Sequence, residues 1–263
     1  MKLHIALGQM DVALGQPDVN FAHVQDLAVK AHEIGADVLV LPELWPTGYD
    51  LERADQYASS LDEGLFTVVS QLAHTYNLHI IGSMLSLIGA GQFGNTAVFF
   101  NNQGQRIGHY SKAHLFRLMD EDQFLTAGDR LTLVQTQWGT MGLSICYDLR
   151  FPELYRTYAL NGAQLVFVPA EWPHPRLAHW RTLLRARAIE NQMFVVACNR
   201  VGESKGTHFF GHSAIIDPWG ETVVEGDETA ELLTAVIDLN VVAEVRQKIP
   251  VFADRRPKLY FPG

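Results

Sequence analysis

Apolar positions in the first third of the chain follow two spacings, which predict alternating strands and helices. Residues 3–9 and 37–41 are short, mainly apolar runs of the kind that form buried strands. Between them, Asn20 is expected to cap a helix and Gly35 to end it. One apolar face of that helix, at helical spacing, consists of Phe21, Val24, Leu27 and Ala31.

The middle and the end of the chain are predicted to contain hairpins mixed with helices. NTAVFF and QRIGHY flank the turn NNQG, and LTLVQ and MGLSIC flank a Trp-Gly-Thr turn, so each pair indicates a hairpin. In HSAIIDPWGETVV, Pro218 and Gly220 suit a turn between two further strands. Other strands are expected at 78–85, 165–169, 193–199 and 231–238, and helices at 64–76, 152–161 and 176–191. The last helix is expected to point Leu177, Trp180, Leu184 and Ala188 inward and its arginines outward.

The order of these elements narrows the fold class to α/β arrangements. Two mixed sheets packed face to face with helices outside, a four-layer α-β-β-α sandwich, satisfy the pattern. A three-layer α/β fold satisfies it nearly as well. Since no linker, repeat or low-complexity tract is visible, residues 1–263 are expected to form one domain, with a polar, proline-containing arm from about residue 240.

Composition excludes several classes of partner. The 20 Lys and Arg against 29 Asp and Glu leave a net charge of -9, whereas nucleic acids and anionic membranes require clustered cations. No apolar run is long enough to span a membrane, and the first residues lack the apolar core of a signal peptide. With two cysteines, a disulfide framework is not expected. We therefore expect a cytoplasmic protein that binds neither nucleic acid nor membrane.

Neither a cofactor nor a metal is predicted. Gly89, Gly91 and Gly94 match the G-x-G-x-x-G pattern of dinucleotide-binding loops, but a strand follows them where that motif needs a helix. The 11 histidines show no ligand spacing. The glycines are therefore interpreted as part of a loop.

Cys146 lies at the end of one apolar run and just before a helix start. Pro152 and Glu153 suit the first turn of that helix. At a strand-to-helix turn, outward-pointing backbone N–H groups stabilise a thiolate or an oxyanion. Taken alone, a small buried side chain at a strand end is the more ordinary interpretation. Cys198, inside MFVVACN with no charged neighbour, is interpreted as structural.

Charged residues end two other predicted strands. Glu43 follows DVLVLP, and Lys112 ends QRIGHYS; a capping Glu and a solvated Lys are the ordinary alternatives. Together with Cys146 in this order, they resemble the nitrilase (carbon–nitrogen hydrolase) superfamily. The matching stretches are LVLPELWPTGYD, GHYSKAHLF and ICYDLRFPE, followed by VPAEWP, RARAIENQ and CNRVG.

The resemblance implies the four-layer fold and a triad of Glu43, Lys112 and Cys146. The second glutamate of the family fits Glu121 best; its alternative is one member of a solvated acidic loop beside Asp120. The resemblance also suggests a homodimer or a higher homo-oligomer that pairs through the helices near 152–161 and 176–191. The aromatic side chains expected at that interface are Tyr155, Tyr158 and Trp180.

The chemistry of this triad follows from the acidities of its groups. A free thiol, with a pKa of about 8.5, is mostly protonated at neutral pH and needs a base, which Glu43 supplies. Lys112 and the backbone N–H of Tyr147 are expected to hold the oxyanion, and Glu121 to orient Lys112 and the leaving amine. An amide then yields ammonia and a thioester, which water hydrolyses. Asp148, Arg150 and Glu153 are expected to form a supporting ion-pair network.

Within the superfamily, CYDLRFP, HLFRLMDE and the EWP segment look most like the bacterial branch close to ω-amidases. Those enzymes hydrolyse short ω-amido-α-keto acids such as 2-oxoglutaramate. The expected pocket walls are Tyr49, Phe116, Trp172 and Arg176, and Arg176 is the expected partner of a substrate carboxylate. The alternatives are an N-carbamoyl amino acid, an aliphatic amide or a nitrile as substrate, a catalytically silent binding homologue, and a Cys–His hydrolase of another fold.

Overall fold

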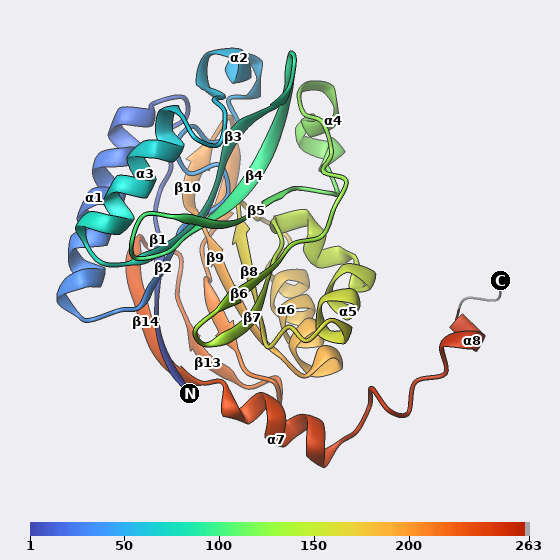
Figure 1. Cartoon of the computed structure of the whole chain (residues 1–263). Coiled ribbons are helices and arrows are strands. Elements are labelled where there is room, and N and C mark those ends of the chain that lie inside the picture. The colour runs from blue at the N-terminus through green and yellow to red at the C-terminus, as the bar shows by residue number, and fades with distance from the viewer. Residues whose placement is uncertain (261–263) are drawn as a thin grey trace.

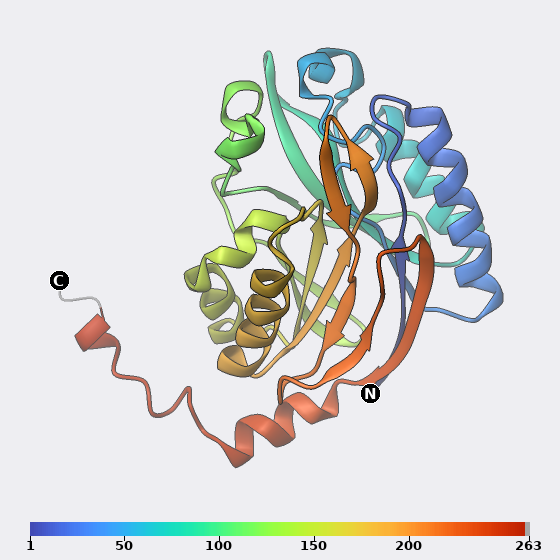
Figure 2. The ribbon, with the colours of Figure 1, turned by 180° about the vertical axis from the view of Figure 1, so that it is seen from behind.

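Two six-stranded sheets pack face to face, with helices on both outer faces (Figures 1 and 2). The computed structural model describes residues 1–260. The strand order is β14-β1-β2-β3-β4-β5 in the first sheet and β13-β12-β9-β8-β7-β6 in the second. This is the four-layer α-β-β-α sandwich, so the predicted fold is confirmed and the three-layer alternative is wrong.

The first sheet combines parallel strands at its centre with antiparallel strands at its sides. Its central strands β1, β2 and β3 are parallel, and the other pairs are antiparallel. Helices α1 and α3 cover its outer face (Figure 1). The elements are β1 (Lys2–Gln9), α1 (Pro17–Glu33), β2 (Val38–Val40), α3 (Gly64–Thr75), β3 (His79–Gly89), β4 (Gln92–Phe100), β5 (Arg106–Ser111) and β14 (Glu231–Asp238).

Helix α1 begins earlier than the sequence pattern predicted. It starts at Pro17, a residue that suits a first helical position because it needs no backbone donor. Asn20 is therefore inside the helix, and the prediction that it caps α1 is wrong. Its buried side chain instead donates to the carbonyl oxygens of Ala13 and Pro46, both at 2.8 Å, and thereby ties α1 to the loop after β2.

The second sheet carries helices α5 and α6 on its outer face (Figure 2). Its strands β7, β8 and β9 are parallel. Trp180, Leu184 and Ala188 point inward as predicted, but Arg187 is also buried and donates to the Leu149 carbonyl oxygen at 3.0 Å. The prediction of outward arginines is wrong at that position. The elements are β6 (Leu133–Thr136), β7 (Gly139–Leu143), α5 (Pro152–Leu160), β8 (Leu165–Ala170), α6 (Leu177–Asn191), β9 (Phe194–Asn199), β12 (Ala214–Ile216) and β13 (Thr222–Glu225).

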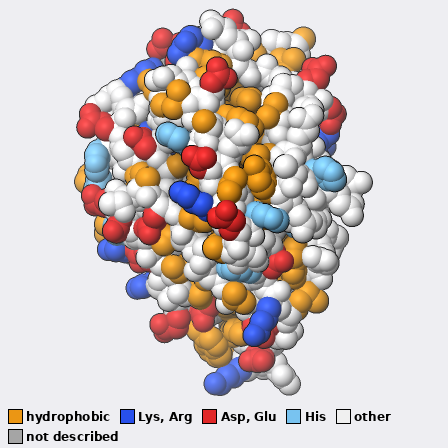
Figure 3. Space-filling model, turned by 90° about the vertical axis from the view of Figure 1, so that its left-hand side faces the viewer, with side chains coloured by type: hydrophobic (Ala, Val, Ile, Leu, Met, Phe, Trp, Pro, Cys, Tyr) orange, Lys and Arg blue, Asp and Glu red, His pale blue; other side chains and the backbone are white. Residues whose placement is uncertain are grey.

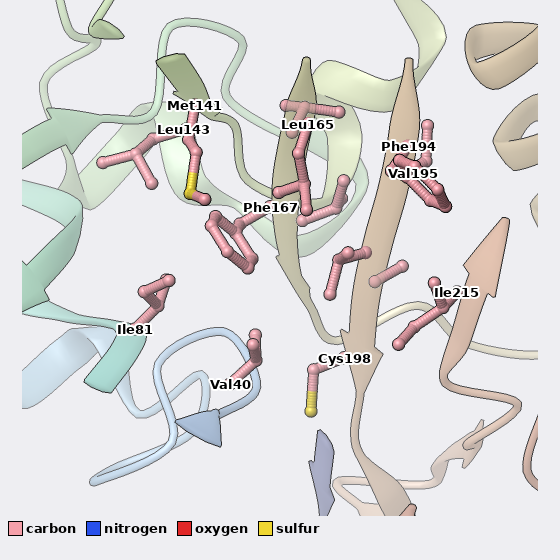
Figure 4. Close-up of a cluster of buried hydrophobic side chains, with 14 of the residues drawn as sticks. Val40, Ile81, Met141, Leu143, Leu165, Phe167, Phe194, Val195, Cys198 and Ile215 are labelled. Atoms are coloured by element: carbon pink, nitrogen blue, oxygen red, sulfur yellow. The ribbon is translucent and has the colours of Figure 1, made fainter. Parts of the chain in front are cut away.

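The main core lies between the two sheets. Val40 and Ile81 of the first sheet face Phe167 of the second across this layer (Figure 4). The rings of Phe99 and Phe167 meet edge to face with their centroids 5.7 Å apart. Cys198 projects into the same apolar layer (Figure 4).

The aromatic side chains expected at a dimer interface belong to this core instead. Tyr155, Tyr158 and Trp180 are 0%, 1% and 0% exposed. Tyr158 donates to the Leu143 carbonyl oxygen and Trp180 to that of His212. Buried aromatic residues with satisfied polar atoms stabilise the protomer. The prediction that they supply interface area is therefore wrong.

The shorter elements frame the edges of the sandwich. Residues 240–248, expected to belong to an arm, form helix α7, whose Val242 and Val245 are buried. Beyond α7 the chain runs away from the sheets (Figures 1 and 2), and the last three residues of the expected arm lie outside the described residues. These elements are η1 (Leu51–Arg53), α2 (Ala54–Tyr57), η2 (Arg117–Met119), α4 (Glu121–Phe124), η3 (Cys146–Arg150), β10 (Val201–Ser204), β11 (Thr207–Phe210), α7 (Asn240–Lys248) and α8 (Pro257–Tyr260).

The described helices and the face formed by α1 and α3 were compared with what a membrane span or a nucleic-acid partner would require. Within residues 1–260, every helix is too short or too polar to cross a bilayer. On the face where α1 and α3 lie, basic, acidic and apolar side chains are interspersed (Figure 3).

Candidate active site

Glu43 is held rigidly in the loop that follows β2. Its side chain is 0% exposed, and its backbone N–H lies 3.4 Å from the Ala170 carbonyl oxygen of the second sheet. The next residue, Leu44, has a φ of 42°, an unfavourable backbone conformation for a residue with a Cβ. Such strain is retained only where the surroundings enforce it, and it turns the carboxylate between the two sheets.

Lys112 lies between two carboxylates at the end of β5. Its Nζ is 2.7 Å from Glu43 Oε1 and 2.8 Å from Glu121, and all three side chains are 0% exposed. Glu121 is the first residue of α4, where its Oε2 also accepts the Phe116 backbone N–H. The structure therefore brings the predicted Glu43, Lys112 and Glu121 together. Glu121 belongs to this cluster, and the alternative of a solvated acidic loop is wrong.

Two further side chains join the same cluster. The Tyr49 hydroxyl lies 3.0 Å from Glu43 and 3.2 Å from Glu121. Asn95 Nδ2 donates to the same two carboxylates at 2.7 and 3.3 Å. Sequence reasoning missed Asn95, although a polar residue at the start of the apolar run NTAVFF was a signal. These donors compensate carboxylates that burial has removed from water.

The electrostatics of the cluster follow from burial and charge. Burial by itself lowers the pKa of Lys112, but Glu121 and Glu43 overcome this and raise it, so the ammonium stays charged. Burial raises the pKa of Glu121, and Lys112 opposes that increase. Lys112 is therefore a fixed positive charge next to whatever binds here.

Cys146 is the first residue of η3, directly after the loop that ends β7. Its φ is 44°, so the nucleophile candidate also has a strained backbone. Burial raises the pKa of its thiol, and the neighbouring Glu43 carboxylate raises it further, whereas Lys112 and the Glu171 backbone lower it. The free protein therefore holds a neutral thiol in contact with Glu43. Such a thiol needs a base, which is the role expected of Glu43, and the N–H groups of the turn remain for the oxyanion.

Asp148 holds the turn that carries Cys146. Its Oδ2 accepts the Ile145 N–H and the Tyr110 hydroxyl, both at 2.9 Å, and its Oδ1 accepts the backbone N–H of His114 at 3.1 Å. In the described residues Asp148 has no ion pair with arginine. The predicted network of Asp148, Arg150 and Glu153 is thus wrong, because Asp148 is satisfied by hydrogen bonds and Arg150 points elsewhere.

A narrow cavity opens onto Cys146. Its free space is about 10 Å³, the size of one water molecule, so a substrate must displace half-buried side chains such as Phe116. Arg150 lies over the Trp172 ring at 4.7 Å, and Arg176 over the Phe116 ring at 5.8 Å. Trp172 Nε1 is buried without an acceptor among residues 1–260. The lining residues are Phe116, Cys146, Tyr147, Arg150, Glu171, Trp172, Pro173 and Arg176.

Three of the four predicted pocket walls, Phe116, Trp172 and Arg176, line this cavity. Tyr49 lines a second cavity of about 240 Å³, bounded also by η1, η2 and the β10–β11 hairpin. Glu171 lines both cavities. The two spaces therefore meet at one carboxyl group beside the thiol.

Sequence reasoning missed Glu171 and its partner Arg200. Both are buried, and Arg200 donates to Glu171 Oε2 at 3.3 Å and to Asp11 at 2.8 Å. The Glu171 backbone N–H donates to Glu43 Oε2 at 3.0 Å. The only sequence signal was a charged residue directly after each of the apolar runs LVFVPA and FVVACN.

Two other groups stand apart from this chemistry. Cys198 is 0% exposed, and burial raises the pKa of its thiol with no charged group beside it. His174, His208 and Glu228 form, within the described residues, the one group that could hold a metal ion, with ligand atoms within 4.8 Å of one another. They lie at the surface, and no reaction step below uses them.

Comparison with known proteins points in the same direction as the geometry. A family model for carbon–nitrogen hydrolases matches residues 4–247. The 2-oxoglutaramate amidase of Bacillus subtilis (strain 168) is 43% identical over 260 residues, 99% of this chain and 100% of that protein. A CN-hydrolase superfamily structure from Xanthomonas campestris, with an arsenic adduct in its active site, is 31% identical with a TM-score of 0.88, covering 97% of this chain and 98% of that chain. A mutant amidase from Nesterenkonia sp. AN1, whose active-site cysteine carries the acetamide moiety of fluoroacetamide, is 26% identical with a TM-score of 0.87, covering 98% and 95%.

Proposed function

Because this chain belongs to the carbon–nitrogen hydrolase family, and is one of its amidases, we propose that it hydrolyses a small ω-amido acid of the 2-oxoglutaramate type. The products are the dicarboxylic acid and ammonia. The Bacillus subtilis relative, a 2-oxoglutaramate amidase, supports this substrate class, and the cavity beside Cys146 supports it independently.

The observation that carries the proposal is a pair of arginines without acidic partners. Arg150 and Arg176 both line the cavity of Cys146. Among the residues described, neither takes part in an ion pair, unlike Arg181, Arg187 and Arg200, which each do. Burial lowers the pKa of Arg150, and the charge of Arg176 lowers it further. Two such guanidiniums attract a substrate carboxylate, and the free Trp172 N–H adds a donor.

The reaction begins with proton transfer from a neutral thiol. Glu43 accepts the Cys146 proton as the sulfur attacks the amide carbon. The developing oxyanion is held by the Lys112 ammonium and by the backbone N–H of Tyr147, in the first turn of η3. Glu43 returns its proton to the amide nitrogen, and the C–N bond breaks. Ammonia leaves, and the acyl group remains on Cys146 as a thioester.

Hydrolysis of the thioester uses the same groups in reverse. Glu43 removes a proton from water, the oxygen adds to the acyl carbon, and the thiol leaves with that proton. Glu121 holds Lys112 in place throughout, through the contact of 2.8 Å. Tyr49 and Asn95 keep both carboxylates oriented. Within the described residues, the groups that act on the Cys146 thiol are Glu43, Lys112 and the Glu171 backbone and include no histidine, which argues against a Cys–His hydrolase.

A panel of substrates tests the proposal. Ammonia release is measured for 2-oxoglutaramate, for a neutral aliphatic amide of equal length, for an N-carbamoyl amino acid and for the matching nitrile. We expect the highest kcat/KM for 2-oxoglutaramate, because it combines a terminal amide with a carboxylate that the two arginines can bind. A neutral amide that is hydrolysed better would refute the substrate class while leaving the triad intact.

An N-carbamoyl amino acid is the second candidate, and the same arginine pair supports it. Such substrates also carry a carboxylate, but cleavage releases carbon dioxide together with ammonia. Carbon dioxide in equal amount to ammonia, with little activity on 2-oxoglutaramate, would favour this candidate.

We also propose that two copies of the chain form a homodimer through the outer faces of α5 and α6. Leu160 and Ile189 on these helices are 43% and 52% exposed, as expected for side chains that a partner covers. Light scattering should give the mass of two chains, and Ile189→Glu should reduce it to one. A one-chain mass for the wild type would refute the dimer.

The chemistry also requires a compartment that keeps Cys146 reduced. Both cysteines are free thiols, which is typical of the cytoplasm. We expect the protein in the cytoplasmic fraction when lysed cells are separated and probed with an antibody.

A further inference from the structure

Glu171 is a buried carboxyl group that the reaction above does not use. It follows directly on β8 and is 1% exposed. Its Oε2 accepts a hydrogen bond from Arg200 Nη1 at 3.3 Å. Its Oε1 is also buried and finds no hydrogen-bond partner within residues 1–260. A buried polar atom without a partner is costly, so its retention points to a ligand that completes it.

The position of Glu171 places this oxygen next to the reacting groups. Its backbone N–H donates to Glu43 Oε2 at 3.0 Å and also contacts the Cys146 thiol. Its side chain lines the cavity that holds Cys146, together with Arg150 and Arg176. An ω-amido acid with its amide at the thiol and its carboxylate at the arginines therefore fills a cavity that Glu171 helps to line.

Burial, more than the neighbouring charges, leaves Glu171 protonated at neutral pH. Its pKa is raised to about 8, mainly by burial and further by Glu43, whereas Arg200 and Lys112 oppose the increase. Because Oε2 already accepts from Arg200, the proton belongs on Oε1. The titratable and charged groups around it are those packed against it, Arg200, Glu43, Lys112, Cys146 and Tyr49, and those that line the same two cavities, Arg150, Arg176, Glu52, Asp120 and Lys205. Below pH 8, Glu171 is thus a buried hydrogen-bond donor that lacks an acceptor.

We propose that Glu171 contacts the substrate and donates a hydrogen bond from Oε1 to the 2-oxo oxygen of the ω-amido acid. This deepens the proposed function and rests on it. The 2-oxo group lies between the amide and the carboxylate, and Glu171 lines the cavity that holds both the thiol and the arginines. The same donor rejects the 2-amino counterpart, L-glutamine, whose ammonium group offers no acceptor and meets the positive charges of Arg150 and Arg176.

A substrate pair isolates this contact. Wild type and Glu171→Ala are compared on 2-oxoglutaramate and on glutaramate, which has the same amide and carboxylate but no 2-oxo group. We expect Glu171→Ala to lower kcat/KM for 2-oxoglutaramate about ten-fold and for glutaramate less than about two-fold, because only the first loses a hydrogen bond.

Asp11→Asn is the matched control. Asp11 is the other carboxylate partner of Arg200, at 2.8 Å, and lines neither cavity. If Glu171 only held Arg200 in place, Asp11→Asn would change the ratio of the two kcat/KM values as much as Glu171→Ala. We expect that ratio to be unchanged in Asp11→Asn, and an equal change would overturn the assignment.

The pH dependence of the same ratio gives a second test that does not need the alanine variant to fold. In the wild type, kcat/KM for 2-oxoglutaramate over that for glutaramate should fall as the pH rises through about 8, since the ionised carboxylate no longer donates. Glu171→Gln keeps a donor at every pH and should give a flat ratio. Because groups that serve both substrates cancel in the ratio, parallel curves for both proteins would overturn the assignment.

The outcomes separate this assignment from the proposed function. Equal losses on both substrates in Glu171→Ala would overturn the role of Glu171 and leave the ω-amidase reaction standing. A wild type that hydrolyses neither substrate would overturn both.

Discussion

The two cysteines of this chain share an environment in most respects and differ in one. Both are free, both lie on or just beyond strands of the second sheet, and Cys146 and Cys198 are only 5% and 0% exposed. Burial raises the thiol pKa of both. Glu43 and Lys112 lie beside Cys146, whereas Ser213 and the Gly8 backbone are the polar neighbours of Cys198.

The difference shows how this site activates a thiol. Many reactive cysteines have a lowered pKa and carry a resting thiolate. Cys146 does not, because burial and the Glu43 carboxylate together outweigh Lys112. Its reactivity therefore depends on a base in contact with the sulfur, and the proton moves only when an oxyanion forms beside Lys112.

The sharpest test of this comparison is removal of the sulfur. Cys146→Ala should lower kcat by more than about 10⁴-fold, to the background of an ammonia assay, because no thioester can form. Its circular dichroism spectrum and melting temperature should remain close to those of the wild type, since the loop is held by Asp148. Residual turnover above one per cent, from protein free of wild type, would contradict the assignment.

Removing the charges that surround Cys146 should make it resemble Cys198. Lys112→Met and Glu43→Gln should each lower kcat by about 10²–10³-fold or more, because one removes the oxyanion's cation and the other the base. Both variants leave the thiol in place, so steady-state kinetics and unfolding curves are measured together. Arg246→Met is the control, since Arg246 is a half-buried cation that donates to the Ala163 carbonyl oxygen at 2.6 Å, at the end of β8 opposite Cys146. Comparable losses in the control would show that the effect is structural.

Much of the frame around Cys146 could be predicted because its parts are local. The apolar runs of β2, β5 and β7 are visible in the sequence, and Glu43, Lys112 and Cys146 each follow one of them. The predicted start of α1 was less accurate. Asn20 has the side chain of a typical helix cap, but it lies inside the helix and donates to the carbonyl oxygens of Ala13 and Pro46. A cap depends on backbone geometry that a residue type alone does not determine.

The rest of the site could not be predicted because its partners are far apart in the sequence. Glu171 meets Glu43 across 128 positions, and Arg200 meets Asp11 across 189. The same limit affected Tyr155, Tyr158 and Trp180, whose helical spacing fits an interface as well as a core. Only the packing of α5 and α6 on the second sheet distinguishes the two.

A smaller loss of kcat/KM is expected when the substitution affects the choice of substrate rather than the reacting groups. Arg176→Ala should lower kcat/KM for a carboxylate-bearing amide about ten-fold, because a charge-assisted hydrogen bond is lost. Activity on a neutral amide of equal length should stay within about two-fold, since Cys146, Glu43 and Lys112 are untouched. Arg185→Ala serves as the control, because Arg185 lies on α6, which Arg176 directly precedes, but donates to Thr222 away from the cavity. Equal losses on both amides would assign Arg176 a structural role.

The smallest effect should come from substitution of Cys198, and it should change the stability of the protein rather than its activity. Cys198 Sγ lies in the layer between the sheets, where the Cys198 side chain is completely buried (Figure 4). Cys198→Ala deletes one buried heavy atom and should lower the free energy of unfolding by about 1 kcal/mol, as the loss of a methylene-sized group does. For a chain of this size the melting temperature should fall by about 2–4 °C, measured by differential scanning calorimetry. The kcat should stay within about two-fold, because no charged group connects this thiol to the site. A variant with unchanged stability but strongly reduced turnover would reverse the roles that the two environments assign.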